Sequence, residues 1–188
     1  MTEAQKLQEE GIRLFHAGRY EEALKRFLEG KELFASNGDL RGEAEMLNNL
    51  GVVYNRLGRW AEAEKAFAGA REFFISAGSK VAEAQTWGNL GDLYRVQGCL
   101  EEASECFRKA IAIFRESGDS QKESLTWRTL SLTRLGQGRF LEAIASYEAG
   151  LSCLENLSWG QRILRWLLRI PLRLMGWTYT DSSHGEEE

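Results

Sequence analysis

Apolar residues recur along most of the chain at intervals of three and four, the spacing that gathers them on one face of an α-helix. In the first forty residues this set comprises Leu7, Leu14, Ala23, Leu24, Phe27 and Leu28. Continued along the chain, the pattern predicts paired helices over about residues 2–17, 20–36, 39–57, 60–77, 79–97, 100–117, 119–136 and 140–155. We therefore expect an all-α protein.

Glycine spacing gives this pattern a fixed period. Glycines stand 40 residues apart in two series, Gly18, Gly58, Gly98 and Gly138, and Gly38, Gly78 and Gly118. The first series opens similar phrases, GRYEEA, GRWAEA, GCLEEA and GRFLEA. Such a period is typical of a solenoid, in which one helix pair stacks on copies of itself. Glycine suits a left-handed helix C-cap, and Asp39, Ser79 and Asp119 follow as predicted N-caps.

The middle repeats carry a specific motif. It reads Leu50-Gly51, Tyr54, Gly58, Trp60, Ala63, Phe67 and Ala70 in the second repeat, and Trp87, Leu90-Gly91, Tyr94, Gly98, Ala103, Phe107 and Ala110 in the third. This resembles the tetratricopeptide repeat, whose pattern W-x2-L-G-x2-Y and then A-x3-F describes two antiparallel helices. The first and fourth repeats are looser, and Ser131 and Arg134 replace the small glycine and the aromatic residue in the fourth.

The resemblance implies a right-handed superhelical solenoid over residues 1–157, with four helix pairs at about 2–38, 39–78, 79–118 and 119–156. The repeat is 40 residues long here, whereas the usual unit has 34. We interpret Gly51, Ala63, Gly91 and Ala103 as close contacts within a pair. We expect the aromatic residues Tyr54, Phe67, Tyr94 and Phe107 to fill the space between pairs.

In this family, the first helix of each pair lines a concave groove that holds peptide partners. Carried over position by position, the groove residues are Asn48, Asn49, Val52 and Asn55 in the second repeat, Gln85, Asn89, Asp92 and Arg95 in the third, and Arg128 and Leu132 in the fourth. An asparagine side chain offers donors and an acceptor to an extended peptide backbone, and asparagine is a poor helix former that needs a reason to recur. The alternative is that these positions are solvated helix faces. Of the family's carboxylate clamp only Asn49 is present, so we do not expect a chaperone-tail co-chaperone.

Composition and charge narrow the function. The net charge of −4 disfavours nonspecific nucleic-acid binding. Cys99, Cys106 and Cys153 form no metal spacing and no even disulfide framework, which favours free thiols in a reducing compartment. His16 and His184 have no nucleophile or metal set around them. We expect no catalysis, no cofactor and no metal, and residues 1–10 are too polar for a signal peptide, which predicts a cytoplasmic location.

The composition changes after residue 157. Residues 158–180 carry a net charge of +4, whereas residues 1–157 and the acidic tail 181–188, which we expect to be disordered, each carry −4. On a helix, Arg162, Arg165, Arg169 and Arg173 fall in one stripe, with Trp159, Trp166 and Trp177 at its border and aliphatic residues opposite. This amphipathic pattern is typical of a helix that lies in a membrane interface. A transmembrane span is disfavoured by the four charges and by Pro171, which should kink the helix or start a second one.

Other roles for this helix stay open. An amphipathic helix can also cap the last layer of a solenoid, bind a partner or a second copy, or occupy the groove as an autoinhibitory segment. The sequence therefore predicts a non-catalytic scaffold or adaptor that binds a protein segment and is held peripherally on an anionic membrane, as would suit an assembly factor for a membrane complex. The alternative is a soluble peptide-sensing regulator whose C-terminal helix is structural. The sequence leaves the partner and the oligomeric state open.

Overall fold

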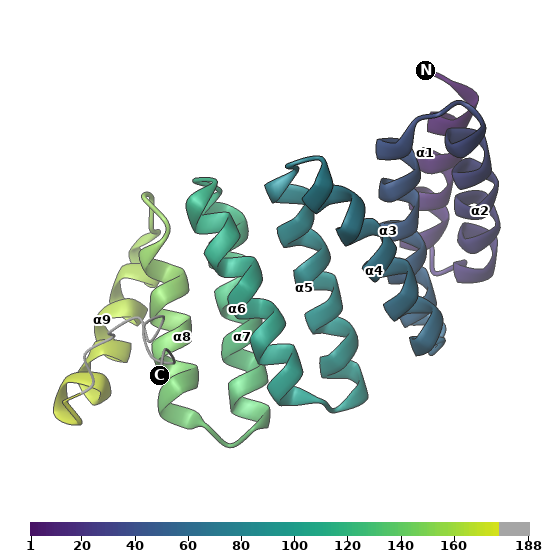
Figure 1. The fold of residues 1–188 in the computed structure, drawn as a ribbon. Coiled ribbons are helices and arrows are strands. Elements are labelled where there is room, and N and C mark those ends of the chain that lie inside the picture. The colour runs from purple at the N-terminus through teal and green to yellow at the C-terminus, as the bar shows by residue number, and fades with distance from the viewer. Residues whose placement is uncertain (177–188) are drawn as a thin grey trace, which may run out of the picture. The chain divides into compact units, whose positions relative to one another are not determined.

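The computed structural model describes residues 1–176, and its regular elements there are all α-helices (Figure 1). The helices are α1 (Glu3–His16), α2 (Tyr20–Ser36), α3 (Leu40–Arg56), α4 (Trp60–Ser76), α5 (Lys80–Gln97), α6 (Leu100–Glu116), α7 (Ser120–Gly136), α8 (Phe140–Ser152) and α9 (Trp159–Leu174). The chain divides into two compact units, Met1–Gly118 and Asp119–Glu188. The all-α prediction is confirmed for the described residues, whereas the superhelical handedness and the domain boundaries stay predictions.

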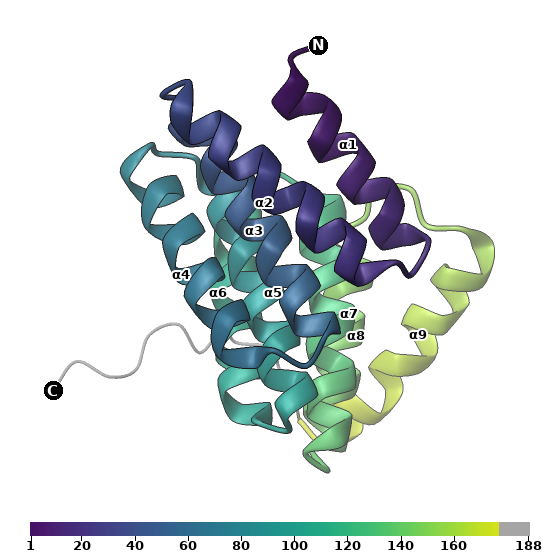
Figure 2. The ribbon, with the colours of Figure 1, turned by 90° about the vertical axis from the view of Figure 1, so that its right-hand side faces the viewer.

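The first unit contains three helix pairs in sequential contact. Each helix from α1 to α5 packs against the next one along the chain, and α3 also contacts α5 (Figure 2). The first helices of neighbouring pairs therefore lie close enough to form a shared surface.

One kind of turn joins these helices. At the end of α1, the amide of Gly18 donates to the carbonyl of Phe15 and that of Arg19 to the carbonyl of Leu14, both at 3.0 Å. This is a Schellman motif, which requires a left-handed residue at the glycine position. The predicted left-handed caps are confirmed, because φ lies between 64° and 83° at Gly18, Gly38, Gly58, Gly78, Gly98, Gly118 and Gly138. Both bonds recur at Gly38, Gly58, Gly78, Gly98 and Gly138, so the turn occurs within pairs as well as between them.

Of the predicted N-cap residues, the two aspartates make a capping hydrogen bond and the shorter serine does not. The carboxylate of Asp39 accepts from the amide of Gly42 at 2.8 Å, and that of Asp119 accepts from the amide of Lys122 at 3.1 Å. Ser79 is the N-cap of α5, as predicted, but its hydroxyl makes no capping hydrogen bond. Its ψ is 67°, close to the 81° of Asp39, and at such a ψ the shorter hydroxyl does not reach the helix amides. The hydroxyl of Thr2 does cap α1, where ψ is 164°.

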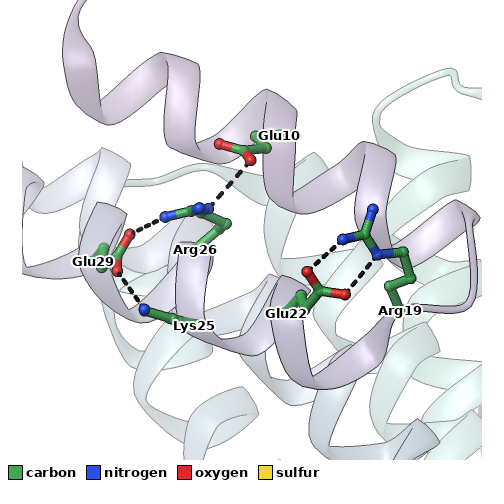
Figure 3. Close-up of polar contacts among 6 residues, drawn as sticks. All are labelled: Glu10, Arg19, Glu22, Lys25, Arg26 and Glu29. Atoms are coloured by element: carbon green, nitrogen blue, oxygen red, sulfur yellow. Dashed lines mark hydrogen bonds and ion pairs between the residues drawn. The ribbon is translucent and has the colours of Figure 1, made fainter.

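The recurring phrase GRxxEA contains an ion pair across the start of the second helix. Arg19 pairs with Glu22 (Figure 3), and Arg59 with Glu62 and Arg139 with Glu142 repeat the contact. Arg19 donates to the carboxylate of Glu22 and thereby lowers the pKa of Glu22. Because these pairs are exposed, solvent screening keeps their contribution to stability small. The third repeat has Cys99 in place of the arginine.

Aromatic residues pack both within a helix pair and between neighbouring pairs. The ring of Phe67 lies against Gly51 in its own pair and clusters with Leu90 and Leu93 of the next pair. The prediction that Phe67 fills the space between pairs was therefore incomplete. The hydroxyl of Tyr94 on α5 donates to Glu64 on α4 at 2.8 Å, and burial together with this carboxylate raises the pKa of Tyr94 to about 12.

In the second unit, α7 and α8 form a pair in which polar contacts replace the glycine and the aromatic residue. The Ser131 hydroxyl donates to the carbonyl of Ala143 at 2.7 Å, and Arg134 donates to the hydroxyl of Ser146 at 2.5 Å. A capping box of Ser158 and Gln161 starts α9. This helix packs against α8 and continues through Pro171 to Leu174, so the expected second helix is absent from residues 159–174.

Candidate functional site

The first unit has a hollow of about 610 Å³ along its first helices. Its walls come from α1, α3, α5 and the turn before α5, and the residues include Gln8, Ile12, Arg41, Glu45, Asn48, Asn49, Lys80, Val81 and Gln85. Three of the predicted groove residues, Asn48, Asn49 and Gln85, lie here together. The sequence interpretation did not assign Ile12 or Val81 to the groove, although both are apolar and exposed.

A smaller hollow of about 190 Å³ shares two residues with the first one. It is lined by Ile12, Phe15, His16, Phe27, Asn49 and Val52. Because Ile12 and Asn49 line both hollows, the two spaces adjoin, and the amide of Asn49 stands between a polar space and an apolar one. The side chain of Asn49 makes no hydrogen bond with another side chain or backbone group of residues 1–176, so it is available to a ligand.

Asn48 has a different role from Asn49. Its Oδ1 accepts from Nδ2 of Asn89 at 3.0 Å and from the hydroxyl of Thr86 at 3.3 Å. These bonds join α3 to α5. The pair Asn48 and Asn89 therefore fixes the spacing of the helices that form the walls of the hollow.

Four further residues predicted for the groove, Asn55, Asp92, Arg95 and Arg128, line neither hollow. Asp92 and Arg95 form an ion pair at 3.0 Å on the surface of α5. Asn55 is half-buried, and its Oδ1 accepts no hydrogen bond within the described part of the chain. Arg128 is exposed on α7 in the second unit. Of the ten residues predicted for the groove, the two hollows therefore bring together Asn48, Asn49, Val52 and Gln85.

Paired charges surround the larger hollow. Arg41 donates to Glu45 at 3.0 Å, and Gln8 donates to the same carboxylate at 3.4 Å. Lys80 pairs with Glu116 at 2.8 Å, which raises the pKa of Lys80. The rim is therefore close to electrically neutral, so it favours neither an acidic nor a basic ligand.

In the second unit, the arginine stripe of α9 faces a carboxylate of α8. The Nε atoms of Arg165 and Arg169 donate to the same oxygen of Glu148 at 2.9 and 2.7 Å. A hollow of about 250 Å³ runs along this side, lined by Leu157, Arg162, Arg165, Trp166, Arg169, Ile170 and Arg173. The structure thus brings the four predicted arginines to one place.

Large apolar side chains of α9 remain in contact with solvent. Trp159 is 80% exposed, Trp166 63% and Leu174 82%, whereas Leu172 is buried. Trp177, also predicted for a membrane interface, lies outside the described residues. Within residues 1–176, no helix combines the length and apolar character needed to cross a bilayer.

No group of three or more potential metal-binding side chains occurs in the described part of the chain. Cys106 is buried, and burial raises the pKa of its thiol to about 11, so it carries no reactive thiolate at neutral pH.

Helix pairs repeating every 40 residues define a class of α-helical repeat protein, and the comparisons identify the family. The tetratricopeptide repeat model matches residues 2–76 and 82–156. The chain therefore belongs to the tetratricopeptide repeat family. Repeats of this family generally mediate protein–protein interactions, and their fold is a non-catalytic scaffold.

Solved structures of other proteins share this fold, among them the following two. BtubC (BKLC) from P. vanneervenii is 20% identical with a TM-score of 0.67, and the match covers 98% of this chain and 69% of that one. A Podosopora anserina protein assigned as a kinesin light chain with nearly identical TPR-like repeats is 15% identical with a TM-score of 0.71, covering 92% and 86%. At these identities the likeness shows the fold alone. The search of curated proteins found no match.

Proposed function

We propose that the chain is a non-catalytic adaptor that binds an extended segment of a partner protein between α1, α3 and α5. The observation that carries this proposal is the pair of adjoining hollows that share Ile12 and Asn49. In this proposal, residues 1–157 are the repeat domain that carries the groove.

The two hollows fit different parts of a peptide. The amide of Asn49 can donate to a backbone carbonyl and accept from a backbone N–H, as can that of Gln85 nearby. The smaller hollow, with Phe15, Phe27 and Val52 in its walls, accepts one apolar side chain. Backbone bonds then supply affinity and the apolar side chain supplies specificity. The bond between Asn48 and Asn89 keeps this surface in place.

Selection of peptides from a random display library on the full chain tests this groove. Selected peptides should share one apolar residue, and V52D should abolish their binding. N49A should weaken binding about 3- to 10-fold, the loss expected for one or two hydrogen bonds. N55A is the matched control, because Asn55 lies on the same helix but lines neither hollow. Unchanged binding by both V52D and N49A would rule out the groove.

We also propose that α9 holds the protein peripherally on a membrane, as an assembly factor for a membrane complex would require. Its exposed Trp159, Trp166, Leu167 and Leu174 support this, because tryptophan and leucine on one amphipathic helix favour the interface. The full chain should co-sediment with anionic vesicles, and L167E/L174E should abolish this. L132E on α7 is the control. If L167E/L174E sediments like the unchanged chain, α9 is not the anchor.

A second candidate is a soluble peptide-sensing regulator in which α9 is a structural cap. The observation in its favour is that α9 docks on α8 through Arg165, Arg169 and the buried Leu172. In that case the intact chain should not bind vesicles, and L172A should lower the melting temperature of the protein.

A further inference from the structure

The arginine-lined hollow of α9 is an unusual concentration of charge. Four guanidinium groups lie around about 250 Å³, and the one carboxylate paired with them within residues 1–176 is that of Glu148. Arg162 and Arg173 have no ion pair with a described carboxylate. Counted over the described residues, the hollow therefore has an excess of about three positive charges, which favours a ligand with more than one negative charge.

Glu148 orients two of these arginines without using their full capacity. Its side chain is 14% exposed, and both bonds to it come from Nε atoms. A guanidinium group has five N–H donors. The terminal N–H groups of Arg165 and Arg169 therefore have no carboxylate partner among the described residues, and Glu148 acts as a positioning residue for them.

We propose that this hollow binds the phosphate monoester headgroup of an anionic phospholipid, an inference that rests on the proposed membrane attachment. A phosphate monoester carries nearly two negative charges at pH 7, and the planar guanidinium fork matches phosphate oxygens in a bidentate manner. The hollow is smaller than the roughly 300–1,000 Å³ of sites for drug-sized molecules, so a single headgroup suits it.

The apolar residues around the hollow indicate a lipid source for the phosphate. Leu157, Trp166 and Ile170 line the same space as the arginines. A phospholipid places hydrocarbon directly beside its phosphate, as this arrangement requires, whereas a free phosphate leaves the apolar residues without a partner.

The test compares two vesicle types with the full chain. One contains phosphatidic acid, a phosphate monoester, and the other phosphatidylglycerol, a diester, with the anionic fraction adjusted to equal surface potential. We expect at least fivefold tighter binding to phosphatidic acid. R162K/R173K keeps the net charge but removes two forks, so the preference should disappear. The matched control R56K/R128K, which alters two exposed arginines outside the hollow, should retain it.

Each alternative result has a separate meaning. Equal binding at matched surface potential, or an unchanged preference in R162K/R173K, overturns the headgroup site and leaves the membrane anchor intact. Failure to bind either vesicle overturns both proposals. If inorganic phosphate binds the full chain as tightly as phosphatidic acid vesicles do, the lipid source is wrong. Equal melting temperatures for both double variants and the unchanged chain establish that folding is unaffected.

Discussion

A Cβ atom on Gly51 would lie 2.5 Å from Cε1 of Phe67, far inside the 3.5–4.0 Å at which two carbon atoms pack. The same relationship joins Gly11 to Phe27 and Gly91 to Phe107, always across the two helices of one pair. The ring thus occupies the volume that a side chain would need. Only glycine allows the helices of these pairs to approach so closely.

Replacing this glycine should destabilise the protein. Phe67 is 1% exposed and packs in a buried cluster with Leu90 and Leu93, so G51A should lower the free energy of unfolding by about 1–3 kcal/mol through overpacking. G88A is the control, because Gly88 is also helical and has no atom within 4 Å of its Cβ position. G88A should be neutral or stabilising by up to about 1 kcal/mol. Urea unfolding measures both, and equal stabilities would contradict the packing argument.

The N-caps should differ in importance as their hydrogen bonds do. D39A removes the acceptor for the amide of Gly42 and should lower the free energy of unfolding by about 1 kcal/mol. S79A occupies the equivalent position one repeat later but removes no capping bond, so its melting temperature should stay within a degree or so of the unchanged chain. A large loss in S79A would show that the hydroxyl caps α5 in solution.

Asp119 should contribute stability that depends on pH. Lys122 donates to its carboxylate from both the ammonium group and the backbone amide, and these bonds lower the pKa of Asp119 below its ordinary value of 3.8. A lowered native pKa stabilises the fold above pH 3.8, and this contribution disappears as the pH falls through the native value. D119N should therefore be less stable than the unchanged chain at pH 7, and the two should converge in acid.

The control for this titration is E155Q, which removes an exposed carboxylate with no ionic partner among the described residues. At pH 7 its free energy of unfolding should lie within about 0.5 kcal/mol of that of the unchanged chain. Urea unfolding between pH 2 and 7, about the range in which carboxylates titrate, gives both curves. A D119N difference that does not change with pH would refute the assigned ion pair.

Cys99 should react with a thiol reagent before Cys106 does. Cys106 is 5% exposed and its pKa is raised to about 11, so only about one thiol in a thousand is ionised at pH 8. Cys99 is half-buried at a helix start and should be modified first. Mass spectrometry of the native protein gives the order. Modification of Cys106 before global unfolding would contradict its placement in the core.

The sequence predicted what depends on local pattern. The helix bounds follow from apolar spacing and from glycines such as Gly18, whose left-handed conformation few other residues tolerate. Ser79 stands at its predicted N-cap position, but its missing capping bond was not predicted, because that bond depends on the ψ of the residue as well as on its type. In the phrase GRxxEA the ion pair of Glu22 with Arg19 was not predicted.

The candidate site depends on contacts that a periodic pattern does not contain. Ile12 and Asn49 come from helices in different repeats, and their meeting at two hollows follows from how α1 packs near α3. The arginine stripe of α9 was visible in the sequence, but its partner Glu148 lies 17 residues before Arg165 on another helix. Nothing in the spacing indicates which side of α9 faces α8.

The Schellman turns have a consequence for how the chain tolerates duplication. Because the turn at Gly58, inside a pair, has the same hydrogen bonds as the turn at Gly78, between pairs, a 40-residue block can be excised or inserted at either one without a new type of junction. Removing residues 39–78 joins Gly38 to Ser79, and removing residues 59–98 joins Gly58 to Cys99. In both cases a left-handed glycine still precedes a helix. Such a protein can thus gain or lose whole 40-residue repeats, with the junction either between helix pairs or inside a pair.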